Sequence, residues 1–80
     1  MAEPGVYDLK GLKCPLPALR AKKRLAGMHP GSQLWLETTD PLASIDIPAF
    51  CTTEGHHLVK RETDGQVQRF LVERGPEEAN

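Results

Sequence analysis

Breaks containing glycine or proline divide this 80-residue chain into short segments, and they constrain its fold more than any other feature. The breaks fall at Lys10-Gly11, His29-Pro30-Gly31-Ser32, Asp40-Pro41, Glu54-Gly55 and Asp64-Gly65. No segment approaches the roughly 20 apolar residues of a membrane helix, and chains of this length seldom hold two cores. We therefore expect one domain over residues 1–80, with an ordered core at about 6–74 and no membrane insertion.

The segments before Asp40 alternate between strand and helix patterns. Strand-forming residues occur at Val6–Leu9 and at Gln33–Thr38. Between these two segments, apolar residues recur at helical spacing, namely Ala18, Ala21, Leu25 and Met28. The pattern predicts a helix that begins at Pro15 and ends near Gly27.

The segments after Asp40 predict a second helix and a hairpin. Asp40 can cap a helix whose first position is Pro41, where a missing N–H costs least. Pro48 removes a backbone donor, so we expect this helix to bend or to break into two pieces. The last two segments flank Asp64-Gly65, a pair typical of tight hairpin turns. The order predicts an α+β fold: a two-layer βαβαββ sandwich with two helices on one face of a mixed four-stranded sheet.

The charge is unevenly distributed along the chain. Residues 1–30 carry six basic and two acidic residues (+4), whereas residues 31–80 carry four basic and nine acidic residues (−5), which sum to −1. Arg20, Lys23 and Arg24 lie on the polar face of the first predicted helix. The near-zero total and the lack of interleaved aromatic residues argue against direct nucleic-acid binding. We interpret these three residues as a docking surface for acidic protein partners.

The two cysteines have different surroundings. Cys14 and Cys51 lie far apart in the sequence without the spacing of metal ligands or of a redox pair, which argues against a metal site. Cys51 follows Phe50 in an apolar helical segment, so we expect it to be buried and inert. Cys14 lies where the Gly11-Leu12-Lys13 loop meets the Pro15-Leu16-Pro17 helix start. Free N–H groups, the helix dipole and nearby lysines favour a thiolate there, which predicts a lowered pKa for Cys14.

A single activated thiol restricts the possible chemistry. The sequence places none of His29, His56 and His57 beside Cys14, so we expect surface or capping roles for them and no general base for acyl transfer. Sulfur-to-sulfur exchange needs only a thiolate and access, without a cofactor. The alternatives are a regulatory interaction module, whose basic helix docks a partner without sulfur transfer, and direct tRNA binding.

The segment Asp8-Leu9-Lys10-Gly11-Leu12-Lys13-Cys14-Pro15-Leu16-Pro17 resembles the D-x-x-G-x-x-C-P-x-P signature of the TusA (SirA-like) sulfur carriers. Later residues are similar to further family landmarks, namely Pro30-Gly31, Asp40-Pro41 and Asp46-Ile47-Pro48-Ala49-Phe50-Cys51. The resemblance extends over about residues 6–74 and implies the same βαβαββ sandwich. It also implies that Cys14 carries sulfur as a persulfide, with Gly11, Lys13, Pro15 and Pro17 in supporting roles.

The resemblance also implies partners. Members of the family take sulfur from a cysteine desulfurase or a rhodanese-like donor and pass it to an acceptor protein. The segment from Asp46 to Cys51 is most similar to the TusA branch that serves 2-thiouridine synthesis in tRNA. Such a protein is a sulfurtransferase only as a persulfide relay. The N-terminus lacks the pattern of a signal peptide, so we expect a cytoplasmic protein, and we expect it to be a monomer.

Overall fold

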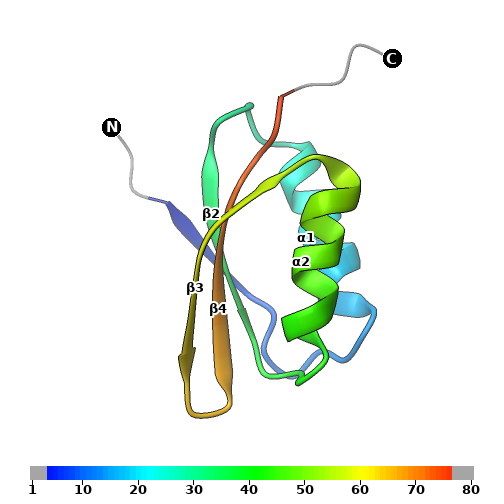
Figure 1. The fold of residues 1–80 in the computed structure, drawn as a ribbon, viewed down its shortest axis with the longest axis vertical. Coiled ribbons are helices and arrows are strands. Elements are labelled where there is room, and N and C mark those ends of the chain that lie inside the picture. Colours follow the sequence, from blue (N-terminus) through cyan, green and yellow to red (C-terminus); the bar gives the residue numbers. More distant parts are fainter. Residues whose placement is uncertain (1–3, 77–80) are drawn as a thin grey trace.

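The structure is a computed structural model that describes residues 4–76. Its elements are β1 (Gly5–Asp8), α1 (Leu16–Ala26), β2 (Gln33–Thr38), α2 (Ala43–Glu54), β3 (His57–Asp64) and β4 (Val67–Glu73). The sheet order is β1-β2-β4-β3, in which β1 is parallel to β2 and the other pairs are antiparallel. Both helices lie on one face of the sheet (Figure 1), so the predicted α+β sandwich is confirmed. Within residues 4–76, neither helix has the length and apolar character needed to cross a bilayer.

The hydrophobic core lies between the sheet and the two helices. Alternate residues of the central strands β2 and β4 point toward the helices, because side chains alternate between the faces of a strand. The buried side chains of these strands and of both helices include Leu34, Leu36, Phe70, Val72, Ala21, Leu25, Ile47 and Phe50. Burial of each large apolar side chain contributes roughly 1.5–3 kcal/mol. The core therefore fixes both helices against the same sheet face.

Helix α2 continues through Pro48, so the expected break into two pieces does not occur. A proline at this position leaves the carbonyl of Ser44, four residues earlier, without its usual backbone donor. The Arg61 guanidinium of β3 donates a hydrogen bond to that carbonyl at 3.4 Å. A side chain from the sheet thus replaces the missing backbone donor.

Two element boundaries differ slightly from the sequence prediction. Helix α2 begins at Ala43, because Pro41 and Leu42 form a separate turn before it. In the hairpin, Asp64 pairs with Val67, so Gly65-Gln66 is the two-residue loop rather than Asp64-Gly65. Gly65 has a φ of +62°, a conformation that glycine adopts without steric cost.

The segment after β4 is anchored to the end of α1. The Arg74 N–H donates to the Ser32 carbonyl at 2.7 Å, and the Arg74 carbonyl accepts from the Gly31 N–H at 2.9 Å. The Arg74 guanidinium donates to the Leu25 carbonyl at 3.0 Å, which satisfies an acceptor in the last turn of α1. Gly75 follows and is buried.

Alanine at Gly75 should destabilise the fold. A Cβ atom at Gly75 would overlap the backbone carbonyl of Gly55, so the two segments would have to separate. We expect Gly75→Ala to lower the free energy of unfolding by about 1–3 kcal/mol, measured by urea denaturation. Gly27→Ala is the matched control, because its Cβ would lie 3.7 Å from the Arg24 carbonyl, an ordinary contact. Equal effects of the two substitutions would contradict this account.

Candidate functional site

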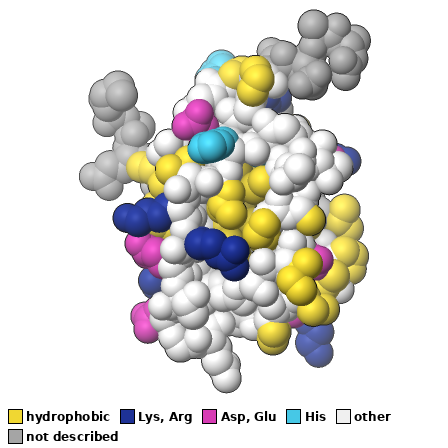
Figure 2. Space-filling model, viewed as in Figure 1, with side chains coloured by type: hydrophobic (Ala, Val, Ile, Leu, Met, Phe, Trp, Pro, Cys, Tyr) yellow, Lys and Arg dark blue, Asp and Glu magenta, His cyan; other side chains and the backbone are white. Residues whose placement is uncertain are grey.

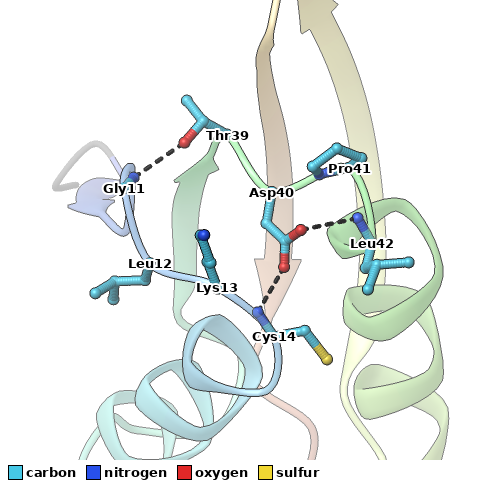
Figure 3. Close-up of a pocket in the computed structure, with 8 residues that line it drawn as sticks. All are labelled: Gly11, Leu12, Lys13, Cys14, Thr39, Asp40, Pro41 and Leu42. Carbon is cyan, nitrogen blue, oxygen red and sulfur yellow. Dashed lines mark hydrogen bonds between the residues drawn. The ribbon is translucent and has the colours of Figure 1, made fainter.

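Cys14 lies in the loop between β1 and α1, at the edge of a concave surface. Its thiol is exposed. Two segments line the cavity, which has a volume of about 420 Å³: residues 11–14 of the cysteine loop and residues 39–42 between β2 and α2 (Figure 3). The fold therefore brings the cysteine loop against the start of α2.

Hydrogen bonds from the segment between β2 and α2 hold the cysteine loop. The Gly11 N–H donates to the Thr39 hydroxyl at 3.0 Å. The Asp40 carboxylate accepts from the Cys14 N–H at 2.6 Å and from the Leu42 N–H at 3.2 Å (Figure 3). Asp40 thus links the cysteine loop to the turn that precedes α2. It caps this turn rather than the helix itself, which begins at Ala43.

The signature residues Gly11, Lys13, Pro15 and Pro17 all lie close to Cys14 along the loop and the first turn of α1. Gly11 has a φ of +86°, which a residue with a side chain rarely adopts. Pro15 is the N-cap of α1, and Pro17 is buried in its first turn. The peptide bond between Cys14 and Pro15 is cis. Gly11 and Lys13 line the cavity together with Cys14.

The pKa of the Cys14 thiol is raised, so the expected lowering is wrong. The largest cause is hydrogen bonding to the Asp46 carboxylate of α2. Partial removal from water and the negative charges of Asp46 and Asp40 raise the pKa further. Each of these effects favours the neutral thiol over a second negative charge.

The positive groups that we expect to favour the Cys14 thiolate are bound to other groups or point away from the sulfur. The Lys10 ammonium lies 2.9 Å from the Glu37 carboxylate and 3.3 Å from that of Asp8. The Lys13 side chain extends away from the sulfur (Figure 3). The Cys14 N–H, one of the donors expected at this helix start, is bound to Asp40. The surroundings of the sulfur are therefore acidic rather than basic.

The predicted docking residues lie on a different surface. Arg20, Lys23 and Arg24 line a second cavity of about 660 Å³ beside β1, together with Tyr7, Gly27 and Met28. The Arg24 guanidinium lies 4.8 Å from the centre of the Tyr7 ring, a cation–π contact. In the part of the chain that the structure describes, no residue lines both this cavity and the Cys14 cavity.

Cys51 and His56 have structural surroundings. Cys51 is 2% exposed, and burial raises its pKa to about 11, so its predicted burial is confirmed. The His56 Nδ1 atom accepts the Gly75 N–H at 3.0 Å, and its ring packs against Phe50. This contact gives His56 a structural role in holding the segment after β4.

The contacts of Thr39, Asp40 and Asp46 with the cysteine loop were not predicted from the sequence. Asp40 and Asp46 each lie in a family landmark, which was the one signal that pointed to them. Thr39 carried no signal, because these contacts join distant parts of the sequence.

The fold and the site together define a small α+β protein with an exposed cysteine where a loop meets a helix. A family model described as "Sulfurtransferase TusA" matches residues 6–74, and the chain therefore belongs to this family. The fold is similar to the crystal structure of a SirA-like protein from Desulfitobacterium hafniense, with 23% sequence identity and a TM-score of 0.76. That similarity covers 89% of this chain and 97% of the other chain. The resemblance to the TusA (SirA-like) family is confirmed.

The two cysteines should differ in reactivity. Iodoacetamide should modify only Cys14 in the folded protein, because Cys51 is buried. The pH midpoint of the Cys14 reaction should lie above the ordinary thiol value, since the Asp46 carboxylate opposes ionisation. Peptide mass spectrometry after timed quenching measures both the modified site and the reaction rate at each pH. Cys14→Ser should remain unmodified until denaturant is added, and a midpoint below the ordinary value would contradict the geometry.

His56 should make stability depend on pH. Burial and the Arg74 charge lower the His56 pKa from its ordinary 6.5, despite an opposing effect of Glu54. The neutral imidazole therefore contributes stability above the ordinary value, and this contribution is lost as the pH falls through the lower folded-state value. His56→Asn retains an acceptor near Gly75 but cannot titrate.

Urea denaturation between about pH 7.5 and 5 tests this expectation. Wild type should lose more stability than His56→Asn across that range. His57→Asn, at the exposed neighbouring position, should behave like wild type. A loss in His56→Asn as large as in wild type would rule out His56 as the titrating group.

Proposed function

We propose that this protein is a sulfur carrier that accepts sulfane sulfur as a persulfide on Cys14 and relays it to an acceptor protein. Membership of the sulfurtransferase TusA family supports the general activity. The observation that carries the residue assignment is the contrast between the cysteines: Cys14 is exposed beside a cavity, whereas Cys51 is buried in the core.

The proposed loading step is an exchange between sulfur atoms. The Cys14 thiolate attacks the outer sulfur of a donor persulfide, R–S–SH, and a new S–S bond forms. The S–S bond of the donor breaks, and the donor cysteine leaves with the electron pair as a thiolate. That thiolate takes up the proton that Cys14 released to water. The step needs no external oxidant, reductant, metal or cofactor.

The relay step reverses these roles. An acceptor thiolate attacks the outer sulfur of the Cys14 persulfide, and Cys14 leaves as the thiolate. Pro15 and Pro17 at the start of α1, with Gly11 in the loop, support this step by limiting the positions that the sulfur can adopt. Lys13 lines the same cavity and contributes to partner contact.

The proposed donor is a cysteine desulfurase or a rhodanese-like protein, and the proposed acceptor is a further sulfur-relay protein of the cytoplasm. The resemblance to the TusA branch favours 2-thiouridine in tRNA as the destination of the sulfur. Arg20, Lys23 and Arg24 offer a positively charged cavity in which an acidic patch of a partner can dock.

Intact-mass spectrometry tests the persulfide directly. Incubation with a cysteine desulfurase and cysteine should add the mass of one sulfur atom to wild type, and a reductant should remove it. Cys14→Ser should gain nothing. Cys51→Ser is the matched control and should load like wild type, because the buried thiol takes no part. A persulfide retained by Cys14→Ser, or none on wild type, would refute the proposal.

Charge reversal tests the docking surface in the same assay. Lys23→Glu together with Arg24→Glu should slow loading by the desulfurase, while the rate of Cys14 alkylation by iodoacetamide stays unchanged. If Cys14→Ser preserves biological activity and charge reversal abolishes it, the interaction module is the correct function instead.

A further inference from the structure

Two carboxylates act on Cys14, one from the segment before α2 and one from α2 itself. Asp40 accepts the Cys14 N–H at 2.6 Å. Asp46 lies one helical turn beyond Leu42, whose carbonyl accepts the Asp46 N–H at 2.9 Å, and its carboxylate raises the pKa of the Cys14 thiol. We name Asp40 and Asp46 the acidic rim. Among residues 4–76, neither forms an ion pair with a basic side chain.

Large apolar side chains are exposed next to the acidic rim. Leu42 lines the Cys14 cavity and is 53% exposed. Leu16 and Ile45, in the first turns of α1 and α2, are 42% and 66% exposed. Hydrophobic side chains gather over the helix side of the molecule in Figure 2. Neighbouring apolar side chains left exposed on a small protein are typical of a surface that a partner covers.

We propose that the acidic rim determines which sulfur donors react with Cys14. It holds the thiol protonated in the free protein, and it favours a donor that carries a positive charge beside its reactive sulfur. This inference rests on the proposed sulfur relay and specifies the chemistry of the donor. Leu16, Leu42 and Ile45 supply apolar contact area, and the donor's lysine or arginine supplies the selectivity.

The physical reason is the negative charge that the thiolate would add to the acidic rim. A cation brought next to Asp46 offsets the carboxylate charge and so favours ionisation of the neighbouring thiol. The thiol proton then leaves to water, and the thiolate attacks the donor sulfur as described above. In the absence of such a cation, Cys14 is a poor nucleophile toward small oxidants and electrophiles.

The described part of the chain supplies no cation of its own to the sulfur. Lys13 of the cysteine loop extends away from it (Figure 3). Of the basic residues of α1, Arg20, Lys23 and Arg24 line the cavity beside β1. The Lys22 ammonium forms an ion pair with the Glu54 carboxylate at 3.5 Å. From β3, the Arg61 guanidinium donates to the Ser44 carbonyl. The positive charge that offsets the acidic rim must therefore come from the partner.

Small disulfides of different charge test this selectivity without any protein donor. Cystamine carries positive charges beside its disulfide, whereas 2-hydroxyethyl disulfide is neutral. Cys14 attacks either reagent, a mixed disulfide forms and the small thiolate leaves. The rate ratio of cystamine to 2-hydroxyethyl disulfide should be about threefold higher for wild type than for Asp46→Asn at 0.1 M salt. In wild type this ratio should fall as salt is added, because salt screens the attraction.

Glu54→Gln is the matched control. It removes the same charge from the same helix, about 12 Å further along at 1.5 Å per residue, beyond the screening length of about 10 Å at 0.1 M salt. It should keep the wild-type rate ratio. Urea denaturation of each variant verifies that the compared proteins are folded.

The pH profile of alkylation separates control of reactivity from a merely structural role. Asp46→Asn should lower the pH midpoint of Cys14 alkylation by iodoacetamide and raise the rate near neutral pH. The rate rises because the gain in thiolate outweighs the accompanying loss of nucleophilicity. A structural role alone would leave the midpoint unchanged.

Three outcomes would overturn the inference. They are a wild-type rate ratio that does not depend on salt, an equal loss of the ratio in Glu54→Gln, and slower alkylation of Asp46→Asn. The last outcome would show that Asp46 assists the reaction by accepting the proton. These assays do not depend on sulfur relay. If wild type prefers cystamine as expected but forms no persulfide with the desulfurase, only the proposed function is refuted.

Discussion

The Asp40 carboxylate binds two backbone N–H groups that belong to different parts of the fold: Cys14 at 2.6 Å and Leu42 at 3.2 Å. Hydrogen bonds to a charged group contribute about 1.5–3 kcal/mol each when they are shielded, and less at an exposed site such as this one. The Asp40 carbonyl in turn accepts the Gln68 amide of β4 at 3.1 Å. Asp40 thus connects the Cys14 loop to the sheet, and this connection fixes the position of the reactive sulfur. The prolines at the start of α1 restrict only the end of the loop that enters the helix.

The same contact sets limits on the chemistry. A carboxylate that holds the Cys14 N–H also places negative charge near the sulfur, and the Asp46 carboxylate adds to this effect. The position of the Cys14 sulfur and its reactivity in the free protein are therefore coupled, because the groups that hold the loop also disfavour the thiolate. A carrier that moves between proteins benefits from such a coupling, since a protonated thiol reacts slowly with oxidants until a partner changes its surroundings.

Most of the fold followed from local sequence signals. The alternation of strand and helix patterns, the caps and the glycines predicted the element order, because each of these signals acts within a few residues. Helix α2 differs from its prediction because it continues through Pro48. The Arg61 side chain, distant in sequence, replaces the backbone donor that Pro48 lacks. The position of Cys14 could be predicted in the same local way, but its pKa could not. The helix start and the neighbouring lysines are local features, whereas Asp46 reaches the sulfur only through tertiary packing.

The nearly neutral total charge conceals two surfaces of opposite sign. Asp40 and Asp46 lie beside Cys14, whereas Arg20, Lys23 and Arg24 line the cavity between α1 and β1. A uniformly charged carrier would attract a partner without orienting it, but separated charges favour one approach over others. A partner with a cation near its reactive sulfur and an acidic patch further away would match both surfaces at once. Such an arrangement aligns the two sulfur atoms during encounter, before any apolar contact with Leu42 or Ile45 has formed.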